Sequence, residues 1–272
     1  MSGLSTDVSP WLARWGLEPD GWPFSTVFTR SLLLPVRQDG RPAMLKLATY
    51  HEEVRGAAMI AWWAGQGAAP VLAREDHALL LLRAGGEGDL KALVAEGRDD
   101  EATAILCGAL AELHGPRPRP PPEGLIPLED WFRSVARAVP QGEVFARGHE
   151  LACALLAEPQ DVRPLHGDMH HGNVLDFGPL GWLAIDPKGV LGERAYDYAN
   201  LFRNPDMETP LSPGRLERQL DLVCRLAGLE PRRMLQWVAA HAVLSLAWCL
   251  EDGMYPDRSM DFIDLAFARL DA

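Results

Sequence analysis

The chain has 272 residues, of which 47 % are apolar and 24 % charged, so its composition is that of a globular protein rather than a mainly disordered one. Aspartate and glutamate (38) outnumber lysine and arginine (26), which gives a net charge of −12. Binding to a phosphate backbone requires a basic face, so we expect no nucleic-acid partner; an acidic chain suits a cationic small molecule instead.

The first third of the chain is predicted to form a small mixed sheet with one main helix. Residues 24–36 (FSTVFTRSLLLPV) and 42–48 (PAMLKLA) are rich in apolar and β-branched residues, and the turn signal QDG between them predicts a hairpin. Helical spacing follows in HEEVRGAAMIAWWAG at 51–65, where glycines end the pattern. Residues 69–76 and 77–86 predict two further strands joined by a polar turn.

The rest of the chain is predicted to be mainly helical. Helical patterns cover residues 88–97 and 99–115 before the proline-rich connector PRPRPPP at 116–122, and residues 128–139 and 143–159 after it. We interpret this connector as a stiff loop, with docking to another protein as the alternative. Short apolar runs around the polar segment LHGDMHHGNVL at 165–175 predict strands, and helical patterns return after residue 193.

These patterns predict an α+β fold of two lobes. The N-terminal lobe, residues 1–83, is small and β-rich, and the C-terminal lobe, residues 84–272, is larger and mainly helical. The composition changes at a hinge near residues 82–88. A cleft between two lobes is a natural ligand site, so we expect the functional residues to meet there.

The polar segment contains the strongest chemical signal. Within HGDMHHGN, Asp168 is followed five positions later by Asn173, and Asp186 follows in the run IDP. Upstream, Lys46 lies in a predicted strand and Glu53 in the helix after it. Phosphoryl transfer requires a carboxylate that accepts the proton of the attacking hydroxyl, hard oxygen ligands for Mg²⁺, and a lysine that holds the phosphates. The order Lys, Glu, Asp-x-x-x-x-Asn, Asp matches the order of these parts in the protein-kinase fold.

On these motifs the chain resembles the aminoglycoside phosphotransferase family, relatives of the protein kinases. The resemblance runs from about residue 24 onward, rests on LHGDMHHGNVL, GWLAIDPKGVLGE and EVRGA, and is greatest to the branch of streptomycin 6-kinases and hydroxyurea phosphotransferases. It implies a protein-kinase-like two-lobe fold with ATP and Mg²⁺ as cofactors. It also implies an antibiotic-resistance kinase that moves the γ-phosphate to a hydroxyl of a small cationic molecule, with a streptomycin-type aminoglycoside or hydroxyurea as the expected acceptor.

The resemblance implies a role for each matching residue. Asp168 is the expected catalytic base, and Asn173 and Asp186 are the expected Mg²⁺ ligands. Lys46 is expected to bind the nucleotide phosphates while it forms an ion pair with Glu53. Glu52 is the alternative partner of Lys46 in this pair.

The remaining nucleotide contacts depart from the protein-kinase pattern. The chain has no G-x-G-x-x-G motif; the equivalent turn is PFSTVF, where Ser25 and Thr26 are expected to contact the phosphates. Leu82 and Ala84, at the hinge, are the other expected nucleotide contacts. His170 stands where protein kinases often have a lysine, so we expect it to contact the γ-phosphate or the acceptor, with a structural hydrogen bond as the alternative.

Other polar residues have candidate roles around the catalytic motif. Glu193 and Asp252 are candidate acceptor contacts, because carboxylates pair with guanidinium and ammonium groups; the acidic cluster around Asp252 is otherwise a solvated face. Asp197 and Asn200, in YDYAN, are expected to be structural, with an inward carboxylate that accepts hydrogen bonds from backbone N–H groups of the catalytic loop. His166 is expected to brace the same loop.

Three alternative functions are compatible with parts of this pattern. A kinase of another small alcohol or sugar would use the same catalytic residues. A metallohydrolase would use His166, Asp168, His170 and His171 around zinc, but it gives no role to Lys46 and its partners. A non-catalytic nucleotide-binding regulator would not need the complete catalytic set that the chain carries.

The chain is expected to be cytoplasmic, as a monomer or a homodimer. The segment MSGLSTDVSP lacks the basic and apolar regions of a signal peptide. The four cysteines contain no Cys-x-x-Cys pair and lie in apolar stretches, which is typical of buried thiols in a reducing compartment. The apolar stretch 235–250 is short for a membrane span and is predicted to be a buried core helix, so we expect no membrane contact.

Overall fold

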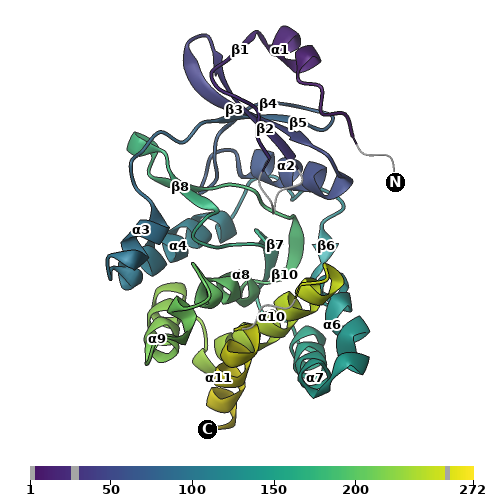
Figure 1. Cartoon of the computed structure of the whole chain (residues 1–272), viewed down its shortest axis with the longest axis vertical. Coiled ribbons are helices and arrows are strands. Elements are labelled where there is room, and N and C mark those ends of the chain that lie inside the picture. The colour runs from purple at the N-terminus through teal and green to yellow at the C-terminus, as the bar shows by residue number, and fades with distance from the viewer. Residues whose placement is uncertain (1–3, 26–30, 255–257) are drawn as a thin grey trace.

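The computed structural model describes residues 4–25, 31–254 and 258–272, apart from the side chains of His51 and Glu52. In Figure 1 the strands of the first third of the chain lie at the top of the molecule and the helices of the last two thirds lie below them. The architecture is therefore the predicted α+β arrangement of a β-rich part and a helical part.

The sheet of the first lobe is antiparallel throughout its described strands. β2 (Ser31–Gln38) and β3 (Arg41–Ala48) form the predicted hairpin, and the turn residues Asp39 and Gly40 both have positive φ (51° and 78°), as a two-residue hairpin turn requires. The other strands are β1 (Leu17–Pro19), β4 (Val71–Glu75) and β5 (Ala78–Leu82), in the order β1-β2-β3-β5-β4 among the residues described.

Two helices accompany this sheet. α2 (His51–Trp63) has the predicted position, but Ala64, rather than a glycine, takes the left-handed conformation that ends it (φ 52°). α1 (Ser9–Trp15) has no counterpart among the predicted elements, because seven residues are too few for a clear helical period. Its Trp11 is nevertheless buried in the small apolar cluster of the sheet.

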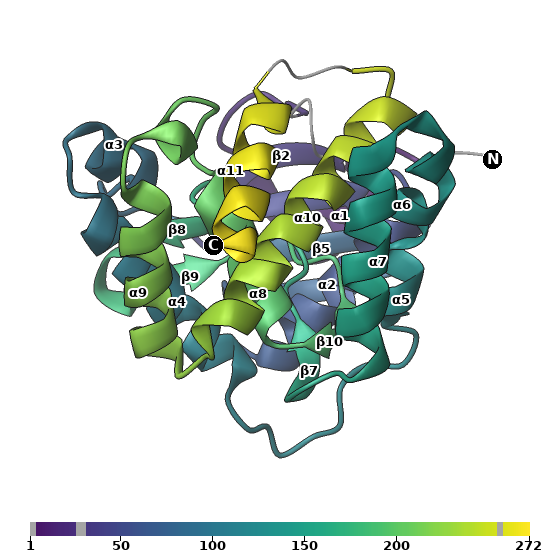
Figure 2. The ribbon, with the colours of Figure 1, turned by 90° about the horizontal axis from the view of Figure 1, so that it is seen from below.

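The second lobe is built around α10 (Pro231–Glu251), in which Trp237 and Val238 are fully buried. Among the described residues, α10 is the one helix with the length and composition to cross a membrane, but its most apolar window is 67 % buried inside the protein. A core helix passes the same test of length and composition, so α10 agrees with the core helix predicted at 235–250. Figure 2 shows α10 between two further helices, α7 (Glu143–Ala157) and α11 (Ser259–Asp271), and both pack against it.

The other elements of this lobe cover the predicted helical and strand segments with one main difference. Residues 128–139, predicted as one helix, form two short helices and a 3₁₀ turn that ends at Gln141. The helices are α3 (Leu90–Ala95), α4 (Asp99–His114), α5 (Leu128–Trp131), α6 (Arg133–Ala138), α8 (Ala195–Ala199) and α9 (Arg215–Ala227). The strands are β6 (Ile126–Pro127), β7 (Val162–Leu165), β8 (Val174–Asp176), β9 (Trp182–Ala184) and β10 (Val190–Glu193).

Backbone hydrogen bonds and a shared core join the two lobes. The N–H of Ala69 donates to the carbonyl of Ala184 in β9, and the N–H of Ala184 donates to the carbonyl of Gly67, both at 2.9 Å. Met59 and Trp63 of α2 belong to the same apolar cluster as the helices of the second lobe. The β8–β9 hairpin, which carries polar residues at both ends, is therefore held directly against the first lobe.

Candidate active site

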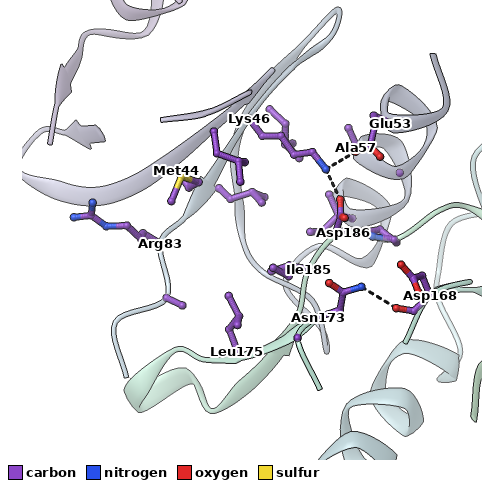
Figure 3. Close-up of a pocket in the computed structure, with 18 of the residues that line it drawn as sticks. Met44, Lys46, Glu53, Ala57, Arg83, Asp168, Asn173, Leu175, Ile185 and Asp186 are labelled. Carbon is purple, nitrogen blue, oxygen red and sulfur yellow. Dashed lines mark hydrogen bonds and ion pairs between the residues drawn. The ribbon is translucent and has the colours of Figure 1, made fainter. Parts of the chain in front are cut away.

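A cavity of about 680 Å³ lies between the sheet of the first lobe and the β8–β9 hairpin, and Figure 3 shows residues of both lobes around it. Its apolar part includes the two predicted hinge contacts, Leu82 and Ala84. In Figure 3, Met44 and Leu175 lie on the side of Arg83, the residue between Leu82 and Ala84 in the chain, and the amine of Lys46 and Asp186 lie on the other side. The cavity thus offers an apolar slot that leads to a charged end.

The charged end begins with Lys46 in the middle of β3. Its neighbours Leu45 and Leu47 are fully buried on one face of the strand, so the period of two turns Lys46 to the cavity. The Nζ of Lys46 lies 2.5 Å from Oε2 of Glu53 in α2 and also pairs with Oδ1 of Asp186. The ion pair predicted between Lys46 and Glu53 is therefore present, while the side chain of Glu52 lies outside the described residues.

Asp186 follows β9 in a conformation that is uncommon for a residue with a side chain. Its φ is 59°, in the left-handed region, and such conformations persist where the surrounding structure holds them. Lys188 pairs with Oδ2 of Asp186 at 3.1 Å and lies 3.6 Å from Oε1 of Glu53. Burial alone would raise the pKa of Asp186, but the ammonium groups of Lys46 and Lys188 hold that pKa well below its ordinary value.

Asp197 of α8 is hydrogen-bonded to the backbone of the loop that carries Asp168. The fully buried Asp197 carboxylate accepts hydrogen bonds from the backbone N–H groups of His166 and Gly167, both at 2.8 Å, and it pairs with Nε2 of His114 at 2.8 Å. This confirms the predicted bracing role of Asp197. His166 is itself buried, and its Nε2 lies 2.8 Å from the carbonyl oxygen of Ile185, so it joins the catalytic loop to the residue before Asp186.

Two asparagines contact Asp168. The amide nitrogen of Asn173 donates to the backbone carbonyl of Asp168 at 2.8 Å, and that of Asn200 donates to Oδ1 of the Asp168 carboxylate at 3.2 Å. Figure 3 shows the amide oxygen of Asn173 on the side away from Asp168, facing the cavity. Because the amide oxygen of Asn173 and the carboxylate of Asp186 are hard oxygen donors, the residues present fit a divalent cation such as Mg²⁺.

The Asp168 carboxylate has an unusual electrostatic environment. Its side chain is 36 % exposed, but it lines the cavity, where the surrounding protein displaces part of its hydration, and this loss of hydration raises its pKa. The Lys188 ammonium opposes the shift, while the carboxylates of Asp186 and Asp197 add to it, and the pKa reaches about 7. A carboxylate that titrates near neutral pH is suited to accept a proton and release it again.

The histidines of HGDMHHGN do not converge on a metal position. The Nδ1 of His170 lies 2.9 Å from the N–H of Gly172, and burial lowers the pKa of His170 to about 3, so the ring is neutral and makes the predicted alternative, a structural hydrogen bond. His170 also lines the cavity, and its Nε2 is 3.9 Å from Asp168. His171 is buried. Among the described residues, no three His, Cys, Asp or Glu side chains are arranged to hold a metal ion, which disfavours the zinc hydrolase.

A family model described as "Aminoglycoside/hydroxyurea antibiotic resistance kinase" matches residues 14–253. The chain belongs to this family. "Streptomycin 3''-kinase" of Klebsiella pneumoniae is 49 % identical over 247 residues, which cover 89 % of this chain and 92 % of that protein. "Hydroxyurea phosphotransferase" of Kitasatospora aureofaciens is 32 % identical, over 99 % of this chain and 80 % of the relative.

The solved structures agree on the fold. A choline/ethanolamine kinase family protein from Mesorhizobium loti matches with a TM-score of 0.64 at 17 % identity, and the match covers 96 % of this chain and 90 % of the other. The kinase therefore has the predicted protein-kinase-like fold, and it is a small-molecule phosphotransferase of the antibiotic-resistance type. Kinase relatives imply the use of ATP.

Four of the other predicted contacts are not among the described residues that line the cavity of the kinase. The structure corrects the expectation for Glu193: its carboxylate is 3 % exposed, pairs with Arg233 at 2.6 Å, accepts the N–H of Gln160 at 3.0 Å, and does not line the cavity. Asp252 is exposed after the end of α10, also outside the cavity lining, so its acceptor contact stays a prediction. Ser25 is described but does not line the cavity, and Thr26 lies outside the described residues.

Sequence reasoning missed two lysines that line the cavity of the kinase. Lys188 lies two positions after Asp186 in IDPKG, and Lys91 lies in the first turn of α3. The position of Lys188 inside a motif already assigned to the metal was a signal that could have identified it. Lys91 has no comparable signal, because it follows the hinge in an ordinary helical pattern.

Proposed function

We propose that the kinase transfers the γ-phosphate of ATP to a hydroxyl of streptomycin. The observation that carries this proposal is the 49 % identity, along nearly the full length of both chains, to the relative named streptomycin 3''-kinase. The acidic character of the chain supports it, because a net charge of −12 attracts a cationic acceptor.

The proposed nucleotide position follows from the two ends of the cavity. The adenine ring lies in the apolar slot beside Leu82 and Ala84, and the phosphates extend to Lys46, which Glu53 holds in place. Lys46, Lys91 and Lys188 give this part of an acidic protein the positive charge that a triphosphate requires.

The proposed chemistry places Asp168 at the acceptor hydroxyl. The hydroxyl oxygen forms a bond to the γ-phosphorus while Asp168 takes its proton, and the bond from that phosphorus to the oxygen of the leaving ADP breaks. Asn173 and Asp186 are the proposed ligands of Mg²⁺, which supplies neutralisation of phosphate charge when it is bound. Asp197 and His166 keep the loop in place during transfer. We also propose a cytoplasmic location, where ATP is available.

A panel of acceptors tests the proposal. Purified protein is incubated with ATP and Mg²⁺ and with streptomycin, hydroxyurea, hygromycin B, choline or a simple sugar, and ADP release and phosphorylated product are measured. Streptomycin is expected to give the highest kcat/KM, and nuclear magnetic resonance of the product identifies the hydroxyl modified. Transfer to another acceptor with streptomycin inert would reject the substrate and leave the kinase activity standing.

The Asp168→Ala variant tests the assigned base. Nucleotide binding is expected to be retained, because Asp168 is not among the proposed phosphate contacts, and transfer is expected to fall by about three orders of magnitude or more. Normal turnover of this variant would reject Asp168 as the base without affecting the choice of substrate.

A further inference from the structure

The chain contains three asparagines, Asn173, Asn200 and Asn204, and all three belong to one hydrogen-bonded cluster around Asp168. Asn173 donates to the backbone of Asp168, whereas Asn200 donates to the carboxylate itself, at 3.2 Å from Oδ1. Asn204 donates to the backbone carbonyl of Asn200 at 2.9 Å and to its side-chain oxygen at 3.1 Å. The second of these bonds occupies the amide oxygen of Asn200 and so turns its NH₂ group toward Asp168.

The position of Asn200 follows from the helix that braces the catalytic loop. Asn200 comes directly after α8 and three residues after Asp197, and residues three apart lie on the same side of a helical turn. Asp197 binds the loop backbone before Asp168, and Asn200 binds the Asp168 side chain. One turn of chain therefore fixes both the loop and its carboxylate.

The segment after Asn200 is anchored to the core by a buried arginine. Arg215 is 2 % exposed, and its guanidinium donates to the carbonyl oxygens of Phe202 and Asn204, both at 3.0 Å. Its other face makes a bidentate pair with Asp99, at 2.8 and 3.0 Å. Because Arg215 fixes the backbone of Asn204, the two asparagine amides have a rigid support rather than a mobile loop.

We propose that Asn200 is a positioning residue that sets the orientation of the Asp168 carboxylate for the acceptor hydroxyl. Its bond holds Oδ1, while Oδ2 has no hydrogen-bond donor in the part of the chain that the structure describes, so Oδ2 is the atom that takes the proton. Asn204 acts through Asn200 by fixing the direction of its amide. The inference rests on the proposed function, which makes Asp168 the base.

Kinetics of two Asn200 variants test the effect on transfer. Asn200→Ala removes the donor and is expected to lower kcat about 10- to 100-fold, with the dissociation constant for ATP changed less than twofold, because the bond orients the base and does not contact the nucleotide. The isosteric Asn200→Asp places a second carboxylate against Asp168 and is expected to lower kcat further. Asn204→Ala, which leaves the Asn200 amide in place, is expected to lower kcat less than tenfold. Gln141→Glu, an exposed change of the same charge, is the control.

A spectroscopic measurement tests the contact independently of activity. With side-chain ¹⁵N-labelled asparagine, the protein gives three amide groups, and the Asn200 signal is assigned by its loss in Asn200→Ala. In Asp168→Ala this signal is expected to shift and to exchange its protons faster, while the Asn173 amide, bound to the backbone of residue 168, shifts less. An Asn200 signal whose chemical shift and proton-exchange rate are unchanged in Asp168→Ala would overturn the contact.

The two experiments separate the inference from the function on which it rests. Wild-type kcat in both Asn200 variants, together with an inactive Asp168→Ala, would reject the positioning role and keep the base. Parallel losses of kcat, ATP affinity and melting temperature in the Asn200 variants would show a merely structural residue. Full activity of Asp168→Ala would instead reject the base itself, and the spectroscopic shift would still report whether the contact exists.

Discussion

At the residue scale, two opposing effects act on the charged form of the Asp168 carboxylate. Partial loss of hydration in the cavity raises the pKa of the carboxylate to about 7, which suits a base but penalises the charged form in the folded protein. Asn200 donates to that same carboxylate and favours the charged form. The ionised carboxylate of Asp168 is therefore less stable in the folded protein than in water.

The raised pKa of Asp168 predicts opposite effects of pH on stability and turnover. The folded protein binds this proton more tightly than the unfolded chain, so its contribution to stability is present below pH 4 and is lost as pH rises toward 7. Turnover needs the deprotonated carboxylate, so kcat/KM for the acceptor is expected to rise with pH through about 7. Thermal melts and rates from pH 5 to 9 measure both.

The Asp168→Asn variant checks the assignment of this titration. It removes the charged form, so the variant is expected to melt at a higher temperature than the wild type at pH 8 and by a clearly smaller margin at pH 5, while it is inactive at both. A melting difference that does not change between these pH values would contradict the pKa of Asp168.

The two lysines that pair with Asp186 are expected to differ in importance. Lys46 contacts both Glu53 and Asp186 closely, from the strand that faces the apolar slot, whereas Lys188 is 3.6 Å from Glu53. Lys46→Met is therefore expected to lower kcat/KM for ATP about 10²- to 10³-fold, and Lys188→Met less than tenfold. Steady-state kinetics with varied ATP measure the difference, and equal losses would refute the ranking.

At the element scale, the active site depends on how closely α2 approaches the loop after β9. Gly56, one turn after Glu53, has no side chain, and a Cβ at this position would lie 2.0 Å from the carbonyl oxygen of Pro187. Only glycine allows the helix to lie directly against the backbone that follows Asp186. This contact sets the distance over which Glu53, Lys46 and Asp186 can meet.

Gly56→Ala is expected to separate α2 from this loop. The steric clash should lower the free energy of unfolding by about 1–3 kcal/mol and reduce kcat/KM for ATP at least tenfold, because the ion-pair geometry depends on the contact. Gly108→Ala in α4 is the matched control: a Cβ there has no neighbour within 4 Å, so this change should raise stability by about 0.5–1 kcal/mol. Denaturant unfolding and ATP kinetics of both variants provide the comparison. Destabilisation by Gly108→Ala alone would contradict the argument.

At the scale of the whole molecule, the cavity draws its residues from both lobes, so a ligand that fills it should stabilise the assembled protein. ATP at about 100 times its dissociation constant is expected to add about 2.7 kcal/mol to the free energy of unfolding. ATP with Mg²⁺ should raise the melting temperature more than ATP with a chelator, because Asn173 and Asp186 are the proposed metal ligands.

Asp186→Asn is the control for this measurement. The variant should still be stabilised by ATP, but the additional shift from Mg²⁺ should largely disappear, because an amide is a weaker ligand than a carboxylate. A full Mg²⁺ effect in Asp186→Asn would reject this residue as a metal ligand. Differential scanning fluorimetry at fixed ATP concentration is sufficient.

Much of the site could be predicted because its parts lie in short segments with local signals. Asp168 and Asn173 share one loop, Asp186 follows the adjacent hairpin, and Lys46 lies between two leucines whose alternation turns it to the cavity. Periodicity fixes which way such side chains face before any tertiary contact is known. For the same reason, the hairpin of β2 and β3 and the buried helix α10 follow from the sequence.

The tertiary structure alone decided which polar groups are free and which are paired. Glu193 carries the negative charge expected of an acceptor contact, but its carboxylate forms an ion pair with Arg233, 40 residues later. Asn200 has the pattern of a structural residue, but the fold brings its amide to Asp168, 32 residues before it. A side chain's partner depends on the packing of distant segments, which no local period encodes. The sequence by itself therefore determined the kinase family and its catalytic motif, whereas only the fold decided how the catalytic carboxylate is held.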